Sequence, residues 1–153
     1  MAWTNFDRSP TEDEIGFVYL IVNETKDRYY IGKKSFWSTV TRPPLKGQTK
    51  KRVVTQESDW QKYYGSNKEL LADRKAGDVM TRHIIRICYS KAEVSYHEAK
   101  TILRMDALLD ERFYNGWLDY TGRSNMLRGL QPDSLPAMHP LNMANCGDEV
   151  VLR

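Results

Sequence analysis

The sequence predicts a small α/β domain of the α+β kind, in which a three-stranded sheet is flanked by helices and followed by an irregular C-terminal tail. Two neighbouring runs of β-branched and aromatic residues, and two capped helical patterns with a strand-like run between them, lead to this prediction. The predicted order is β-β-(long loop)-α-β-α. A length of 153 residues with 41% hydrophobic content fits one core.

The first two strands are expected at residues 16–22 (GFVYLIV) and 28–33 (RYYIGK). Both runs are rich in residues that favour strands, and the polar residues 23–27 between them are typical of a turn. We therefore predict a β-hairpin. Residues 35–62 contain Pro43-Pro44 and no sustained period, so we expect a long loop with at most short extended pieces. Loops of this length usually carry function.

A helix and a third strand are predicted next. Ser66 followed by Glu69 forms a capping-box pattern and Gly77 is a natural helix stop, which predicts a helix over residues 67–76. Residues 79–89 (VMTRHIIRICY) alternate as in a strand, which places the odd-numbered residues from 79 to 87 on one face.

A second helix and the tail complete the chain. Ser90 with Glu93 repeats the capping box, and apolar residues recur at helical spacing to about Leu109. Glycine and proline residues break any long element within residues 118–153, so this tail is expected to be irregular.

Positive charge is concentrated in one segment. Residues 26–62 hold ten Lys and Arg residues against three acidic ones, a net charge of +7, whereas residues 1–25 carry −4 and residues 63–153 balance. Aromatic residues are interleaved with these cations, a mixture that suits phosphate contacts and stacking on bases. The other interpretation is a solvated lysine-rich loop. The candidate nucleic-acid-binding residues are Lys34, Lys46, Lys50, Lys51, Arg52, Trp60, Lys62 and Tyr64.

Two negative observations narrow the class of protein. No window holds the run of about 18 uncharged apolar residues that a bilayer span requires. Residues 1–16 lack the basic start and apolar run of a signal peptide. We therefore expect a cytoplasmic protein with no membrane partner. Cys88 lies in an apolar run, so a reduced structural thiol is favoured over a disulfide or a metal pair with Cys146.

Two short motifs carry a family resemblance. Gly16-Phe17-Val18-Tyr19 and Tyr30-Ile31-Gly32 are separated by ten residues, and Glu98 on the second helix and the pair Tyr114-Asn115 follow in order. This pattern resembles the GIY-YIG nuclease family, with one extra residue between the first glycine and tyrosine. The stretches YIGKKSFW and ESDWQKYYGSNKEL resemble phage-encoded members of that family.

The resemblance covers residues 15–117 and implies a division of the chain. Residues 1–14 form an N-terminal arm, residues 15–117 a nuclease domain, and residues 118–153 a C-terminal extension. The implied function is a metal-dependent DNA endonuclease, phage-encoded, of a homing or mobile-element type or one that cleaves competitor DNA. Its partner is double-stranded DNA, and the protein is a monomer or a DNA-induced dimer.

The resemblance also implies residue roles. Tyr19 contacts or activates the attacking water with Tyr30 beside it, Glu98 holds Mg²⁺ or Mn²⁺, and Asn115 is a phosphate- or backbone-orienting group. A tyrosine pKa of about 10 leaves little phenolate at neutral pH. Nearby cations, such as Lys33, and the metal itself are expected to lower that pKa; Arg28 and Lys26 are further candidates for this effect.

One member of the family pattern has no clean equivalent. The family usually has an arginine about ten residues after the second tyrosine, but residue 40 is a valine. Arg42, Arg52, or Lys33 together with Lys34, are the candidates for its role, and the sequence leaves the choice open. We include Arg42 and Lys33 among the candidate catalytic residues.

Each of these residues also has an ordinary structural interpretation. Tyrosines in strands are often half-buried, a glutamate beside an apolar stripe is often solvated, and asparagine is common in turns. His97 lies about 100° around the helix from Glu98 and is expected at the surface. The competing functions are a non-catalytic nucleic-acid-binding module and a structural protein. Retention of Tyr19, Tyr30 and Glu98 favours the enzyme.

Overall fold

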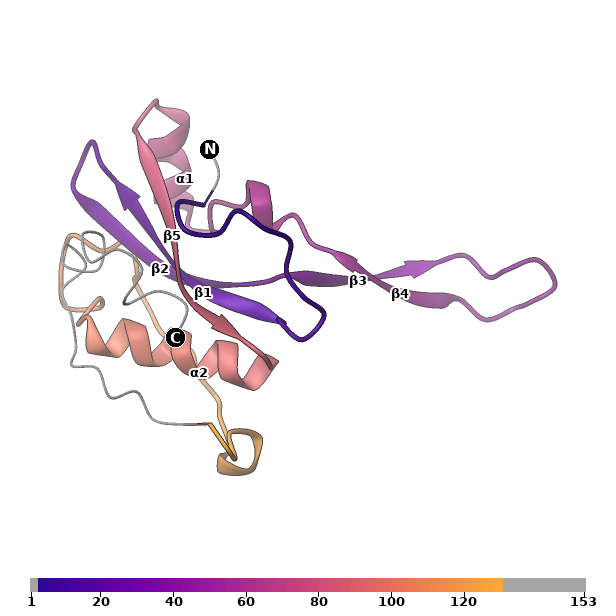
Figure 1. Ribbon diagram of the computed structural model, residues 1–153. Helices are drawn as coiled ribbons and strands as arrows, with labels where there is room; N and C mark the ends of the chain where they lie inside the picture. The colour runs from indigo at the N-terminus through magenta and orange to yellow at the C-terminus, as the bar shows by residue number, and fades with distance from the viewer. Residues whose placement is uncertain (1–2, 131–153) are drawn as a thin grey trace.

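Figure 1 shows the computed structural model of the chain, in which residues 3–130 are described. An antiparallel three-stranded sheet in the order β2-β1-β5 forms the body, and a two-stranded antiparallel sheet, β3-β4, projects away from it. The predicted α+β fold is confirmed. The elements are β1 Gly16–Asn23, β2 Arg28–Ser35, β3 Trp37–Arg42, β4 Arg52–Glu57, α1 Lys68–Lys75, β5 Met80–Cys88 and α2 Lys91–Arg104, with short 3₁₀ helices at Trp60–Lys62 and Ser124–Met126.

Strand β1 is the centre of the core. All of its residues are buried, and it pairs with β2 along one edge and with β5 along the other. One face of the sheet packs against α2 through Val94 and Ile102. The opposite face packs against Leu70 of α1 and against Trp60. Because both faces are covered, β1 is a continuous apolar run rather than an alternating one.

Residues 3–14 pack against the sheet before β1 begins. Trp3 and Phe6 belong to the core cluster on the α1 side, and the Trp3 indole donates a hydrogen bond to the carbonyl of Trp60 at 3.0 Å. Glu14 is buried and accepts two hydrogen bonds from the guanidinium of Arg8. The division of the chain at residue 14 stays a prediction; within residues 3–14, Trp3, Phe6 and Glu14 are buried.

The face predicted for the third strand is wrong because β5 contains a β-bulge. Val18 pairs with Arg86 whereas Tyr19 pairs with Ile84, so Ile85 is an extra residue. An extra residue shifts the alternation of side chains by one position. Ile85 therefore packs on the α2 side of the sheet, while Ile87 packs on the α1 side.

The helices form near their predicted positions, and their caps explain the differences. Ser90 caps α2 as predicted, accepting a hydrogen bond from the Glu93 amide at 3.1 Å. Asn67, not Ser66, caps α1. The second helix ends at Arg104 rather than near residue 109, and Asp106 just beyond it has a left-handed backbone with φ of 51°.

The long loop predicted over residues 35–62 is wrong. Residues 37–57 form a β-hairpin, which we call the ribbon, and a 3₁₀ helix follows it. No residue of β3 or β4 is buried. The hydrophobic alternation that reveals a strand comes from a buried face, and this hairpin has none.

The two histidines and the cysteine in the sheet and α2 also have defined places. His97 is buried, contrary to the expected surface position, and lies 3.2 Å from a guanidinium nitrogen of Arg86. His83 is half-buried in β5 and its ring contacts the hydroxyl of Thr4. Cys88 is buried; Cys146 lies outside the described residues, so the reduced thiol stays a prediction. Among residues 3–130, the helices are too short and polar to cross a bilayer.

Candidate active site

The register of β1 and β2 explains the pairing of tyrosine and glycine in the two motifs. Tyr19 lies directly opposite Gly32. A Cβ atom on Gly32 would overlap the Tyr19 hydroxyl. Glycine at this position therefore makes room for a phenol that lies over the neighbouring strand. As a result Tyr19 is almost completely buried, with 1% of its surface exposed.

Tyr30 lies in front of Tyr19 and reaches solvent. The two ring centroids are 6.1 Å apart, and Tyr30 lines a pocket of about 390 Å³. Tyr19 does not line that pocket. The structure thus separates the two phenols that the motifs place together: Tyr30 presents its side chain to the pocket, and Tyr19 supports it from inside the core.

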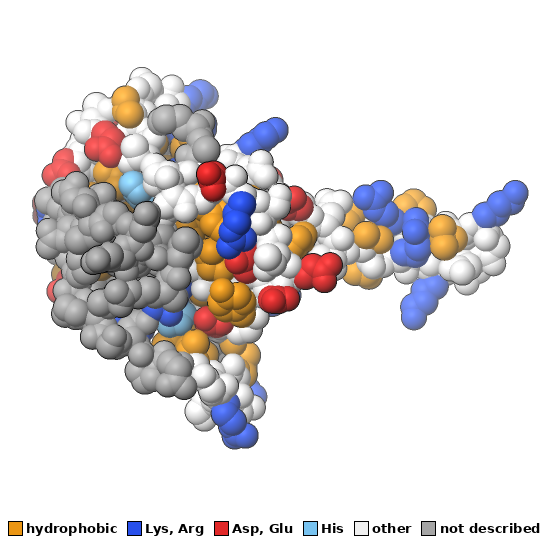
Figure 2. Space-filling view, in the orientation of Figure 1, with side chains coloured by type: hydrophobic (Ala, Val, Ile, Leu, Met, Phe, Trp, Pro, Cys, Tyr) orange, Lys and Arg blue, Asp and Glu red, His pale blue; other side chains and the backbone are white. Residues whose placement is uncertain are grey.

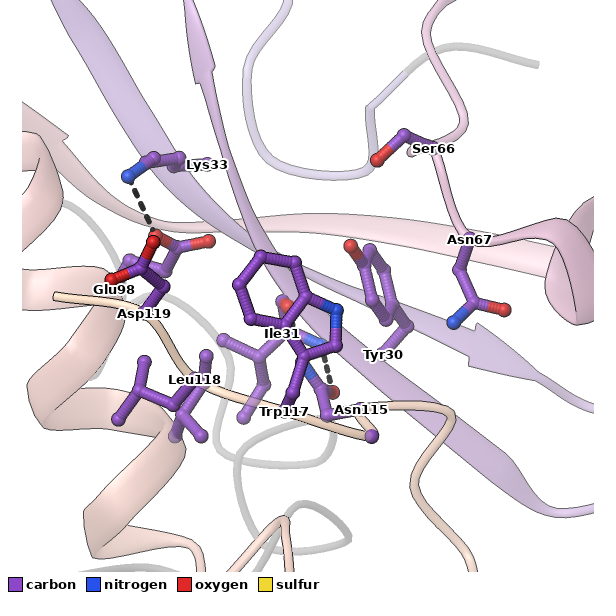
Figure 3. A pocket seen from close by; sticks show the side chains of 12 residues that line it. Tyr30, Ile31, Lys33, Ser66, Asn67, Glu98, Asn115, Trp117, Leu118 and Asp119 are labelled. Atoms are coloured by element: carbon purple, nitrogen blue, oxygen red, sulfur yellow. Dashed lines mark hydrogen bonds and ion pairs between the residues drawn. The ribbon is translucent and has the colours of Figure 1, made fainter.

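Glu98, Lys33 and Asp119 form the charged side of the same pocket (Figure 3). Glu98 comes from α2 and its side chain is 18% exposed; Lys33 comes from β2. The Lys33 ammonium lies 3.0 Å from a Glu98 carboxylate oxygen and 3.2 Å from the Ser95 hydroxyl. The Glu98 carboxylate therefore faces strand β2 of the sheet.

Asn115 is bound to the backbone of β2. Its amide nitrogen donates to the carbonyl of Ile31 at 2.8 Å, and its amide oxygen accepts from the Ile31 amide at 3.0 Å. The preceding residues continue this pairing, because the Tyr114 amide donates to the carbonyl of Tyr29. Asn115 thus holds the strand beside Tyr30, which matches the backbone-orienting role rather than a phosphate contact.

The pKa values of the two phenols move opposite to the expectation. Burial raises the pKa of Tyr19 well above its ordinary value, and burial is also the largest cause of the raised pKa of Tyr30. A hydrogen bond with Ser66 partly opposes the increase at Tyr30. The cations Arg28 and Lys26 do not counter it, because they pair with carboxylates on α1, Glu69 and Asp73 respectively. Both phenols are therefore neutral at pH 7.

Several pocket residues have no sequence signal that singles them out. Ser66 and Asn67 form the rim opposite Lys33 and Glu98, and Trp117 stands over the pocket with 75% of its surface exposed. Gly65 permits the close approach of the rim, because its φ is +81° and a Cβ atom there would lie 3.0 Å from the Tyr30 ring.

The structure corrects three candidate assignments outside the pocket. Trp60 is 3% exposed and packs in the core, and its indole nitrogen donates to the Glu57 carboxylate. Tyr64 is buried as well, with the guanidinium groups of Arg74 and Arg82 over its ring. Neither aromatic ring is available for stacking on a base. Composition identifies aromatic residues but gives no information on which of them a fold buries.

Arg42 is the third correction. It lies on the ribbon, where its guanidinium contacts Gln56 at 3.4 Å, and it does not line the pocket. Arg52 lies opposite it on β4. Lys34 also faces away from the pocket, since it pairs with Asp59 at 2.6 Å and stacks on Tyr63. Of the residues considered for the missing arginine, Lys33 lines the pocket.

The remaining basic candidates are exposed. Lys46, Lys50 and Lys51 lie in the turn of the ribbon and Lys62 ends the 3₁₀ helix after it. Figure 2 shows Lys and Arg side chains spread along the projecting ribbon. These four lysines do not line the pocket, where Lys33 is the basic residue.

Comparison with known proteins decides the family. Residues 1–118 match a family model described as "Putative endonuclease segE, GIY-YIG domain". The chain belongs to the GIY-YIG endonuclease family. No curated protein and no solved structure matches the chain. The matched region begins at residue 1, so the segment containing Trp3 and Phe6 belongs to the GIY-YIG domain as the family model defines it.

Family membership makes the domain a nuclease domain with DNA as its substrate, and it bears on the pocket. In this GIY-YIG domain, both tyrosines of the motifs, Glu98 and Asn115 lie within one region beside β2. The described residues contain no group of three or more His, Cys, Asp and Glu side chains that could hold a metal. Two carboxylates line this pocket, Glu98 and Asp119, and a cation there would depend on one or both of them, with water and substrate oxygens as further ligands.

Proposed function

We propose that the GIY-YIG domain hydrolyses phosphodiester bonds of double-stranded DNA at the Tyr30 pocket, with one Mg²⁺ or Mn²⁺ held by Glu98. The main support is that Tyr30 and Lys33 of β2 line one open pocket with Glu98, which comes from the distant helix α2. Phosphodiester hydrolysis needs groups that orient water and neutralise charge on the phosphate. A phenol, an ammonium group and a carboxylate supply that chemistry.

The donor set fits a hard divalent cation. Mg²⁺ commonly binds through one or two carboxylates, keeps several waters and takes other oxygens from a substrate phosphate. Glu98 supplies one carboxylate in an open pocket, where a phosphate has access. When bound, the ion would supply neutralisation of the charge that builds on the phosphate.

Lys33 has two roles in this proposal. Without DNA it pairs with Glu98 and holds the carboxylate in the pocket. If a cation were held by Glu98, the Lys33 ammonium would be available to pair with a phosphate in the pocket. Its side chain is 41% exposed, so it has room to move.

The neutral phenol of Tyr30 acts as a hydrogen-bonding group. Because its pKa is raised chiefly by burial, it donates to a phosphate oxygen, and donates to or accepts from water, without ionising. Asn115 fixes the strand that carries Tyr30. The exposed ring of Trp117 supplies a surface on which a base next to the cleaved bond stacks.

A plasmid-nicking assay tests the proposal. The wild-type chain is expected to nick supercoiled plasmid in Mg²⁺ and to stop in EDTA. Glu98→Gln, which keeps the shape but removes the charge, is expected to lower the rate at least about 100-fold while duplex binding persists. Glu111→Gln is the matched control, because Glu111 is exposed and does not line the pocket.

Two outcomes contradict the proposal. Equal nicking by the Glu98→Gln variant and the wild type would remove the carboxylate from the chemistry. Duplex binding without nicking under any metal or salt condition would instead support the second candidate, a non-catalytic nucleic-acid-binding module.

We further propose that cleavage serves a phage-encoded homing or mobile element, or removes competitor DNA. The support is the resemblance of residues 57–70 to segments of phage-encoded family members. A map of cut positions on a panel of genomic DNAs tests this role. A few recurrent sites would support it, and cuts without sequence preference on every DNA would contradict homing.

A further inference from the structure

The ribbon has features that folding does not explain. No residue of β3 or β4 is buried, and an isolated two-stranded hairpin is marginally stable in water. Apart from Trp37, which packs partly against the core, its strands therefore contribute little to the core. The other side chains of the ribbon need another explanation, and their charge supplies one.

All formal charges in the ribbon between residues 38 and 56 are positive. This stretch contains no Asp or Glu. Among the described residues, none of its cations forms an ion pair with a carboxylate. The cations are Arg42, Lys46, Lys50, Lys51 and Arg52. Such a surface is complementary to a polyanion.

The strand register places the two arginines against each other. Arg42 lies directly opposite Arg52, and side chains of opposed residues in an antiparallel pair project to the same face. Like charges in this position destabilise a hairpin. Gln56 shares that face, and its carbonyl oxygen is 3.4 Å from a nitrogen of Arg42. An anionic partner between the arginines would remove their repulsion.

The base of the ribbon is fixed to the body beside the candidate active site. Strand β2, which carries Tyr30 and Lys33, continues into β3 with Phe36 buried between them. The Ser58 amide donates to the carbonyl of Phe36 at 2.8 Å, and the core residue Trp60 follows. The direction of the ribbon is thus set by the same strand that positions the pocket (Figure 1).

We propose that the ribbon enters the major groove of the DNA duplex on which the pocket acts. This inference rests on the proposed function and adds a groove and a set of residues to it. The major groove, about 12 Å wide, admits a two-stranded β-ribbon. The face of Arg42, Arg52 and Gln56 contacts base edges, since arginine pairs with guanine and glutamine with adenine. Lys46, Lys50 and Lys51 at the turn contact phosphates.

Duplex binding in EDTA tests the inference without requiring cleavage. All chains carry Glu98→Gln, and fluorescence anisotropy measures affinity for a labelled duplex. Removing both arginines, Arg42→Ala with Arg52→Ala, is expected to weaken binding at least about tenfold. The matched control removes two exposed lysines on α1, Lys68→Ala with Lys75→Ala, and is expected to change affinity less than about threefold. Equal losses in the two double variants would overturn the inference.

The turn lysines have a different expected signature. The triple variant Lys46→Ala, Lys50→Ala and Lys51→Ala is expected to reduce the slope of log affinity against log salt by about 0.9 for each lost phosphate contact. An unchanged slope would place the turn away from DNA.

Competition by groove-binding ligands and affinity for duplex RNA test the inference without any substitution in the ribbon. Methyl green, which occupies the major groove, is expected to compete with the protein, whereas the minor-groove ligand netropsin is not. A duplex RNA of the same sequence is expected to bind weakly, because its major groove is deep and narrow. Competition by netropsin alone, or equal affinity for duplex RNA, would overturn the inference.

The outcomes separate the ribbon from the catalytic proposal. If the wild-type chain nicks plasmid but the double-arginine variant binds duplex like its parent, the ribbon inference fails and the nuclease stands. If the double-arginine variant loses binding but no chain nicks DNA, the catalytic proposal fails and the ribbon stands.

Discussion

The body around β1 and the ribbon are built on opposite physical principles. Every residue of β1 is buried, and its two faces are covered by different segments of the chain. The ribbon buries none of its strand residues and carries like charges opposite each other. The body is therefore fixed by packing, so a substitution there changes stability. A substitution in the ribbon is expected to change the recognition of DNA.

The largest effect on stability is expected from a substitution in the body, at Gly32. Gly32→Ala places a methyl group where the Tyr19 hydroxyl lies, and the core around Tyr19 leaves it no space to move. We expect a loss of about 3 kcal/mol in the free energy of unfolding, measured by urea titration. Gly116→Ala is the control, because no atom lies within 4 Å of its added Cβ. Equal stability of the two variants would show that packing at Tyr19 is looser than the structure indicates.

A second, smaller effect tests the N-terminal part of the body through pH. Hydrogen bonds from Arg8 are the largest cause of the lowered pKa of Glu14. A lowered folded-state pKa stabilises the fold above the unfolded pKa of about 4.3, and this contribution is lost as the pH falls through the folded pKa. Arg8→Ala is therefore expected to cost about 2 kcal/mol at pH 7, because it leaves a buried carboxylate with fewer partners.

Measuring this loss of stability at several pH values provides the control. The difference in unfolding free energy between the wild type and Arg8→Ala should shrink as the pH is lowered below about 4. Glu12→Gln, at an exposed position, should follow the wild type throughout. A constant difference at all pH values would mean that the loss comes from the contact of Arg8 with the Phe6 ring and not from Glu14.

The same contrast explains which parts of the fold the sequence predicts. Burial leaves a pattern, so the apolar runs of β1 and β2 and the capped helix α2 are visible without coordinates. The ribbon has no buried face and thus no pattern, so its sequence predicts a loop. The extra residue Ile85 is also invisible, because a β-bulge depends on how two strands pair.

The sequence motifs predict part of the candidate site. Tyr30, Glu98 and Asn115 belong to these motifs and lie around one pocket. The motifs do not show how deeply each residue is buried. Burial keeps Tyr19 out of the pocket and raises the pKa of both phenols. The rim residue Trp117 depends on the path of the chain after α2, which no local pattern specifies.

The smallest expected effect tests the ribbon itself. Arg42→Ala should change the free energy of unfolding by no more than about 0.5 kcal/mol, because the residue is exposed and away from the core. A slight gain is expected at low salt, since the variant removes a positive charge opposite Arg52. The gain should vanish near 1 M salt, where charges are screened beyond about 3 Å.

Urea titration at two salt concentrations measures this difference, with Thr41→Ala as a neutral control on the other face of β3. A loss of stability of 1.5 kcal/mol or more on removing Arg42 would contradict the contrast between the body and the ribbon, since the ribbon would then be an integral part of the body. A residue that weakens duplex binding when removed, yet leaves the fold as stable or more stable, is retained for its partner. That combination is what distinguishes a recognition element from a structural one.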